Sequence, residues 1–184
     1  PFLMFLARTN PDPASGHRSL SMFLVEKPSS AGHAFDVEQE SGGQLSGRAI
    51  ATIGYRGMHS YELFFDNFLV PAENMIGGDE GEGQGFYLAM AGFAGGRIQT
   101  AARAVGLMRA AFERAISYSK ERVVFAHPIG DYQLTRVKLA RMAAHLLACR
   151  QITYGVAELM DQGSGDMEAS GAKIFASKTS EWFT

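Results

Sequence analysis

Residues 96–133 read GRIQTAARAVGLMRAAFERAISYSKERVVFAHPIGDYQ, and this stretch decides the fold. Its apolar side chains recur at intervals of seven, three, four and four residues, which places them on one face of an α-helix. They are Ile98, Val105, Met108, Phe112 and Ile116. A short connection around His127-Pro128 leads into a second apolar-periodic segment, so we expect two long helices that pack antiparallel.

The second helical segment has an apolar stripe of its own. Its members are Met142, Leu146, Cys149, Ile152, Val156 and Leu159. The sequence DQGSGD at 161–166 ends this segment, and Asp166 is expected to cap a third helix that begins near Met167. Cys149 is the single cysteine, and its place on the stripe predicts a packing role.

Upstream of the helices the sequence changes to short apolar runs. FLMFLAR at 2–8, SMFLVEK at 21–27 and YELFFDNFLV at 61–70 predict strands, and a stretch rich in turn-forming residues separates the first two. GGDEGEGQG at 77–85 contains three carboxylates and lacks the Lys-Ser/Thr of a phosphate-binding Walker loop. We interpret it as a flexible acidic linker.

The expected fold class is therefore α+β. An antiparallel β domain at 1–80, a sheet or a barrel, is followed by an antiparallel helical bundle at 81–184. With 46% hydrophobic residues the chain can build a core, and a net charge of −2 over 184 residues gives no basic field for nucleic acid. One cysteine cannot form a disulfide framework, and no apolar run approaches the roughly 20 residues of a membrane span.

Metal binding and nucleophilic catalysis have no support in the sequence. The histidines are scattered and show no ligand spacing with cysteine or carboxylates, so no metal site is predicted. They are His17, His33, His59, His127 and His145. No GxSxG motif is present, and the lone cysteine lies on an apolar helix face.

The corner between the two long helices carries Arg122, Phe125 and Gln133. In one interpretation Arg122 only compensates the dipole at the end of the first helix, which contributes about 0.3–1 kcal/mol. In the other, its planar guanidinium binds a phosphate, the phenylalanine offers a face to a ring, and the glutamine adds an amide contact. These residues by themselves leave both interpretations open.

Four stretches in the same order resemble the acyl-CoA dehydrogenase family, flavoenzymes that oxidise acyl-CoA thioesters to enoyl-CoA. The resemblance covers nearly the whole chain and lies in FLARTNPD, GYRGMHSYELFFDNFLVPAENMIGG, the opening stretch with its Tyr-x-x-x-Arg-x-x-Phe and later Gln, and AKIFASKTSEW. It implies FAD as the cofactor and an acyl-CoA as the substrate. The first and last residues resemble a strand and a helix already under way, so we expect a piece of a longer protein.

By this resemblance, Arg122, Val124, Phe125 and Gln133 are expected to contact the pyrophosphate and adenine side of an FAD held mainly by a neighbouring chain. Val124 replaces a residue that is often polar in relatives, so its contact would be through backbone or packing. Ala126 stands where the family usually has glycine. The backbone path after Phe125 therefore depends on whether alanine can adopt a conformation that glycine permits.

The resemblance also implies substrate contacts. Arg97 resembles an arginine that lines the acyl-CoA cleft, with a helix–helix salt bridge as the alternative, and His17 is a second candidate. Gly96 occupies the position where isovaleryl-type relatives carry their catalytic glutamate, which excludes that variant. The catalytic base is expected beyond Thr184 and the flavin-stacking strand before Pro1, so no catalytic residue is predicted within the chain.

The implied reaction removes the α proton with a carboxylate and transfers the β hydrogen to the flavin as hydride. Electrons then pass to an electron-transfer flavoprotein, or to oxygen in an oxidase. GYRGMHSYEL, ARTNPD and RIQTAARAVG are most similar to the methylsuccinyl-CoA dehydrogenase branch, in which a second substrate carboxylate needs a cationic or polar partner. An acyl-CoA with a short branched chain or a medium-length straight chain is the alternative substrate.

The family's bundle implies a homo-oligomer, a dimer or tetramer, in the bacterial cytoplasm or the mitochondrial matrix. Two hypotheses of other functional classes compete with the hypothesis of an enzyme. One is a catalytically inactive family member that acts as an assembly subunit, which the residue at the base position would reveal. The other is an unrelated β-plus-helix binding module, which would purify without flavin.

Overall fold

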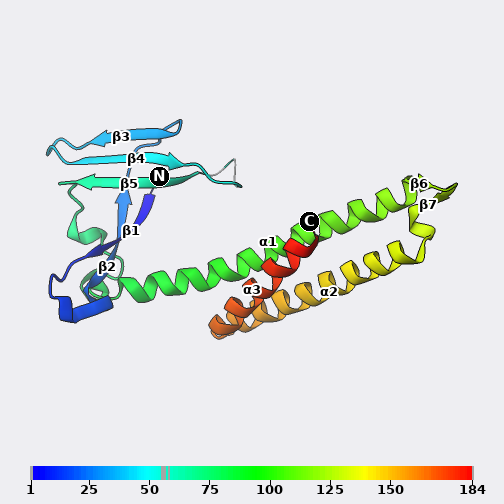
Figure 1. The fold of residues 1–184 in the computed structure, drawn as a ribbon. Coiled ribbons are helices and arrows are strands. Elements are labelled where there is room, and N and C mark those ends of the chain that lie inside the picture. The colour runs from blue at the N-terminus through cyan, green and yellow to red at the C-terminus, as the bar shows by residue number, and fades with distance from the viewer. Residues whose placement is uncertain (1, 55–56, 58, 184) are drawn as a thin grey trace. The chain divides into compact units, whose positions relative to one another are not determined.

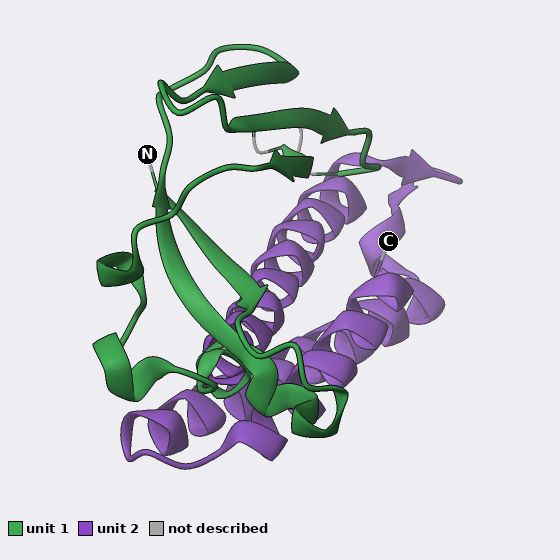
Figure 2. Ribbon diagram, turned by 90° about the vertical axis from the view of Figure 1, so that its left-hand side faces the viewer, with its two compact units in different colours: residues 1–89 green, residues 90–184 purple. Residues whose placement is uncertain are grey.

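The computed structural model of the protein describes residues 2–54, 57 and 59–183 (Figure 1). The chain divides into two compact units between Ala89 and Met90, and Figure 2 shows the units in different colours. The boundary between the units falls inside the first long helix, and the domain division near residue 80 stays a prediction. Tyr55, Arg56 and Met58, part of the GYRGMHSYEL stretch, lie outside the described residues.

The first unit begins with a two-stranded antiparallel sheet. β1 (Phe2–Arg8) pairs with β2 (Leu20–Glu26), with Phe5 opposite Phe23. The strand predictions at 2–8 and 21–27 are therefore confirmed to within one residue. Between the strands, the predicted loop contains a short 3-10 segment, η1 (Pro13–Ser19).

A second, three-stranded antiparallel sheet follows in the order β3-β4-β5. β3 is Ala34–Glu38, β4 is Gln44–Ile50 and β5 is Ser60–Asp66, so the predicted strand at 61–70 begins one residue earlier and ends four residues sooner. Along β5 half-buried and exposed side chains alternate, as expected for a strand with one face on a core. β3 and β4 carry several polar residues, and the sequence did not predict these two strands.

An aromatic contact connects the two sheets. The rings of Phe5 in β1 and Phe65 in β5 lie 4.3 Å apart, centroid to centroid. Val25 of β2 and Leu45 of β4 are at most 1% exposed, so each sheet buries apolar side chains. The antiparallel arrangement agrees with the expected fold class, but the described strands of the first unit form two separate sheets and no closed barrel.

Residues 77–85, interpreted from the sequence as a flexible linker, are instead packed against the first sheet. They contain a 3-10 turn, η3 (Gly78–Gly81), and Gly83 is buried with its N–H donating to Ser21 Oγ at 3.0 Å. A side chain would not fit here, because a Cβ on Gly83 would lie 2.6 Å from the carbonyl oxygen of Arg18. Gly83 thus serves close backbone packing rather than flexibility.

The second unit is helical, and in Figure 1 its two long helices run antiparallel, as the sequence predicts. The third helix lies across them, and a very short hairpin joins the first two. The elements are α1 (Gly85–Glu121), β6 (Val123–Val124), β7 (His127–Pro128), η4 (Ile129–Asp131), α2 (Gln133–Asp161) and α3 (Asp166–Phe183). No helix of the described residues combines the length and the hydropathy needed to cross a membrane.

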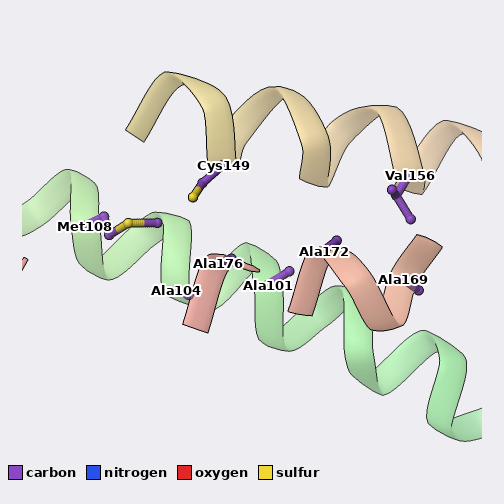
Figure 3. Close-up of a cluster of buried hydrophobic side chains, with 8 residues drawn as sticks. All are labelled: Ala101, Ala104, Met108, Cys149, Val156, Ala169, Ala172 and Ala176. Carbon is purple, nitrogen blue, oxygen red and sulfur yellow. The ribbon is translucent and has the colours of Figure 1, made fainter. Parts of the chain in front are cut away.

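Small side chains form the core of this unit (Figure 3). Each of the three helices contributes to one buried cluster, made of Ala101, Ala104, Met108, Cys149, Val156, Ala169, Ala172 and Ala176. Alanines allow helices to approach closely, because helix separation depends on the side chains at the contact. The packing role predicted for Cys149 is confirmed, since this residue is 1% exposed.

Two helix predictions need correction. Ile152 and Leu159 are 41% and 38% exposed, because the buried face of α2 instead runs through Cys149, Thr153 and Val156. Thr153 can lie there because its hydroxyl donates to the Cys149 carbonyl at 2.7 Å. Asp166 is the first residue of α3 rather than its cap, and the Gly165 carbonyl accepts the hydrogen bond from the N–H of the fourth residue.

Candidate functional site

The corner between α1 and α2 carries all the residues that the sequence analysis assigns to cofactor binding. Arg122 directly follows α1, Val124 ends β6, Phe125 starts the hairpin turn, and Gln133 is the first residue of α2. In the hairpin Val124 lies opposite His127. The structure thus places the four predicted residues at one end of the helix pair.

The hairpin turn has an unusual backbone. Phe125 and Ala126 both have positive φ, at 51° and 67°. Two consecutive positive φ values are typical of a type I′ turn, which usually takes Asn-Gly because other residues lose about 1–2 kcal/mol each in the left-handed region. Ala126 therefore adopts a conformation that glycine favours, and the backbone path there does not require glycine.

Two hydrogen bonds fix this turn to its surroundings. The phenolic Oη of Tyr132 donates to the carbonyl oxygen of Val124 at 2.6 Å. The N–H of Ile129 donates to the carbonyl oxygen of Arg122 at 2.8 Å. Because both bonds hold backbone carbonyls, they set the direction of the peptide groups on either side of the exposed turn.

The corner presents a cation and an aromatic ring to solvent. The Phe125 side chain is 88% exposed, the highest fraction among the large apolar side chains that the structure describes in the second unit. Arg122 is exposed, and among the residues that the structure describes its guanidinium has no hydrogen-bond or ion-pair partner. An arginine and an exposed ring three residues apart in the sequence, at the same corner, suit a ligand that combines phosphate with an aromatic base.

The other two predicted cofactor residues have different surroundings. Val124 is half-buried, and its carbonyl is already engaged by Tyr132, so packing is the contact that its side chain can offer. Gln133 is exposed at the start of α2, where backbone N–H groups lack helical partners and an anion is stabilised by the helix dipole. Its amide can still donate to a ligand.

Arg97, the predicted substrate contact, lies in the second unit on α1 and is half-buried. The alternative assigned to it was a salt bridge between helices. Among the described residues Arg97 forms no ion pair, so nothing in this part of the chain supports that alternative. The substrate contact stays a prediction.

His17, the other predicted substrate residue, lies in the first unit on η1. Its Nε2 is hydrogen-bonded to the Oη of Tyr87 at 2.8 Å, and its ring lies 5.2 Å from that of Phe86, centroid to centroid. The histidine therefore ties η1 to the first turn of α1. Its ring edge is still exposed, so a ligand contact is compatible with this role.

Two tyrosines at these places were not found from the sequence. Tyr132 and Tyr87 act through their hydroxyl groups on partners that are eight and 70 residues away. Tyr132 directly precedes the predicted Gln133, and an aromatic residue with a hydroxyl at a helix start is the only signal that the sequence offered. Tyr87 and His17 are 70 residues apart, so no local sequence pattern indicates their hydrogen bond.

A groove of about 330 Å³ lies between α1 and α2, away from the predicted residues. Its floor is apolar, with Val105, Phe112 and Leu146, and Arg109 and Arg150 lie at its rim. The Arg109 pKa is raised by a hydrogen bond and charge attraction from Glu113, 2.8 Å away. No group of three or more metal-ligating side chains occurs among the described residues.

Cys149 gives a prediction about thiol reactivity. Burial raises the pKa of its thiol above the ordinary value, and a side-chain hydrogen bond with Thr179 acts in the opposite direction. We expect native Cys149 to react with iodoacetamide at pH 8 at least roughly tenfold more slowly than in denaturant, because only the thiolate is the nucleophile. Equal rates in the two states, measured by mass spectrometry, would contradict this.

The same shift has a consequence for stability. Above the unfolded-state pKa, about 8.5 for a free cysteine, the thiol ionises in the unfolded chain while the folded chain keeps it protonated. The stabilising contribution is therefore fully present below that pKa and is lost as pH rises toward the raised folded value. A Cys149→Ser variant should lack this part of the pH dependence of unfolding.

Residues 83–184 match the family model described as Acyl-CoA dehydrogenase, C-terminal domain. A (2S)-methylsuccinyl-CoA dehydrogenase of Cereibacter sphaeroides is 40% identical over 178 residues, which are 96% of this chain and 31% of that protein. The chain thus spans about a third of the length of that relative.

Solved structures give a consistent result. Butyryl-CoA dehydrogenase from Megasphaera elsdenii matches with a TM-score of 0.80 at 31% identity, covering 96% of this chain and 42% of that one. A chain from work on the electron transferring flavoprotein of Acidaminococcus fermentans and flavin-based electron bifurcation matches with a TM-score of 0.80 at 32% identity, again over 96% and 42%.

Proposed function

The chain belongs to the acyl-CoA dehydrogenase family, and from this premise we propose that the intact protein is an FAD-dependent enzyme that oxidises an acyl-CoA thioester between its α and β carbons. The observation that carries the proposal is the helical corner, where Arg122 has no hydrogen-bond or ion-pair partner among the described residues and Phe125, 88% exposed, lies in a turn held by the Tyr132 hydroxyl. When bound, FAD supplies the two-electron acceptor that no amino-acid side chain provides.

The corner residues would bind and orient the dinucleotide. Arg122 would hold the pyrophosphate with two parallel N–H donors, and Phe125 would cover one face of the adenine ring. Gln133 would add an amide contact, and Val124 would pack beside them. Because these residues project from the end of a helix pair, we propose that they complete an FAD site on a neighbouring chain.

Two residues are proposed as substrate contacts, Arg97 on α1 and His17 in the first unit. Arg97 offers a permanent positive charge on α1, and His17 offers a ring nitrogen beside the hydroxyl of Tyr87. The C. sphaeroides relative acts on a methylsuccinyl-CoA, which carries a second carboxylate by its name. We propose a substrate of this type, since a second carboxylate requires a cationic or polar partner.

We propose an electron-transfer flavoprotein as the acceptor and a homo-oligomer as the assembled state. The first is supported by the likeness to the chain from the A. fermentans work on such a flavoprotein. The second is supported by large apolar side chains that the helices leave exposed, among them Leu107, Leu147 and Phe175. A monomer mass in sedimentation of the intact protein would exclude the oligomer.

The deciding experiment is a visible spectrum of the intact protein under anaerobic conditions, before and after addition of methylsuccinyl-CoA, butyryl-CoA and isovaleryl-CoA. A flavin band that bleaches with one thioester would support the reaction and name the substrate class. A band that bleaches with none of them would favour an inactive assembly subunit. Absence of flavin would refute the proposal, and rapid reoxidation on admission of air would favour an oxidase.

A further inference from the structure

The strained turn at the corner needs something to hold it. We propose that Tyr132 is a positioning residue, whose phenolic hydroxyl clamps the Val124 carbonyl and keeps Phe125 presented outward. This inference rests on the proposed contact between the corner and FAD. It assigns to Tyr132 no contact with the ligand, only control of the turn that makes one.

A hydrogen bond to the Val124 carbonyl oxygen can control the conformation of the turn. This carbonyl belongs to the peptide group that joins Val124 to Phe125, so a hydrogen bond to it fixes the backbone torsions on both sides of that peptide. Rotation of this peptide would change the turn type and turn the Phe125 side chain to another direction. The 2.6 Å bond from the Tyr132 hydroxyl opposes that rotation.

The hairpin has little strength of its own. It consists of two residue pairs, and in one of them Val123 lies opposite Pro128, which has no N–H to donate. The turn also places Phe125 and Ala126 at positive φ, which neither residue favours. A turn that is strained and joined by so short a ladder requires support from outside, and the phenol comes from beyond β7.

Tyr132 is itself held firmly. Its N–H donates to the Ile129 carbonyl at 3.2 Å, and its own carbonyl accepts from the N–H of Arg136 in the first turn of α2, at 3.1 Å. The Arg136 side chain donates from Nε to the Gly130 carbonyl at 2.9 Å. The hydrogen bond from Tyr132 therefore connects the exposed turn to the 29-residue helix α2, which restricts the motion of the turn.

The test is Tyr132→Phe in the intact protein, with the Kd for FAD measured by titrating the apoprotein and following the quenching of flavin fluorescence. Loss of one hydrogen bond to the backbone should raise the Kd about 3- to 10-fold. Ala126→Gly in the same variant should restore it, because glycine adopts the left-handed conformation freely. Tyr154→Phe, on the exposed surface of α2, is the matched control and should leave the Kd unchanged.

The outcomes separate this proposal from the cofactor assignment. If Arg122→Ala weakens FAD binding and Tyr132→Phe does not, the clamp is refuted and the corner contact stands. If Tyr132→Phe weakens binding and Ala126→Gly fails to restore it, the hydroxyl does not act through the turn, and the positioning role is overturned. If neither Arg122→Ala nor Tyr132→Phe changes the Kd, both proposals fail. Circular dichroism of each apoprotein verifies that it is folded.

Discussion

Arg122→Ala should raise the Kd of the intact protein for FAD about 10- to 100-fold, the loss expected when a charge-assisted hydrogen bond to a phosphate is removed. The guanidinium has no competing partner among the described residues, so its donors are available to the ligand. Removing it should leave the fold intact, because the side chain is exposed. The measurement is the flavin retained after gel filtration at decreasing protein concentration, followed by titration of the apoprotein.

Arg114→Ala is the control for this experiment. It removes the same charge from an exposed position on α1, two helical turns before the corner. If general electrostatic attraction held the dinucleotide, both variants would weaken binding to a similar degree, and the effect would decline with salt. Full flavin occupancy of Arg122→Ala after dilution would show that the guanidinium does not contact FAD.

The helices could be predicted from the sequence because periodicity reports which face is buried. The stripe that includes Met108 correctly located the core of α1, and the apolar stripe of α2 correctly included Cys149 and Val156. It failed at Ile152, where hydrophobicity suggested burial, because the buried face of α2 runs through Cys149, Thr153 and Val156. Which face of a helix is buried also depends on the helices that pack against it. The periodicity of a single segment does not determine those contacts.

The sequence indicated which residues would lie at the corner between the two long helices, but not the geometry of the turn there. Arg122 and Phe125 were identified from the resemblance and their place between two helices. The turn that presents them depends on a hydroxyl from Tyr132 and on an alanine in a conformation that alanine disfavours. Both are properties of the folded chain, because tertiary contacts overrode the local preference of Ala126.

Gly83→Ala should destabilise the first unit by about 2–5 kcal/mol, which combines roughly 1–2 kcal/mol for the left-handed backbone with roughly 1–3 kcal/mol for a forced backbone shift. Gly83 has φ of 73°, and an added Cβ would lie 2.6 Å from the Arg18 carbonyl oxygen. That oxygen is backbone and cannot turn aside as a flexible side chain can. Hydrogen exchange of the intact protein should show lost amide protection in β1 and β2.

Gly163→Ala separates the two causes of this loss. Gly163 also has a left-handed φ, 80°, but a Cβ there would meet nothing within 4 Å. Gly163→Ala should lower the free energy of unfolding only by the cost of the left-handed backbone, about 1–2 kcal/mol. A larger loss for Gly83→Ala would mean that the glycines of 77–85 are required for close packing against β2, whereas equal losses would restore the interpretation of this stretch as a loosely attached linker.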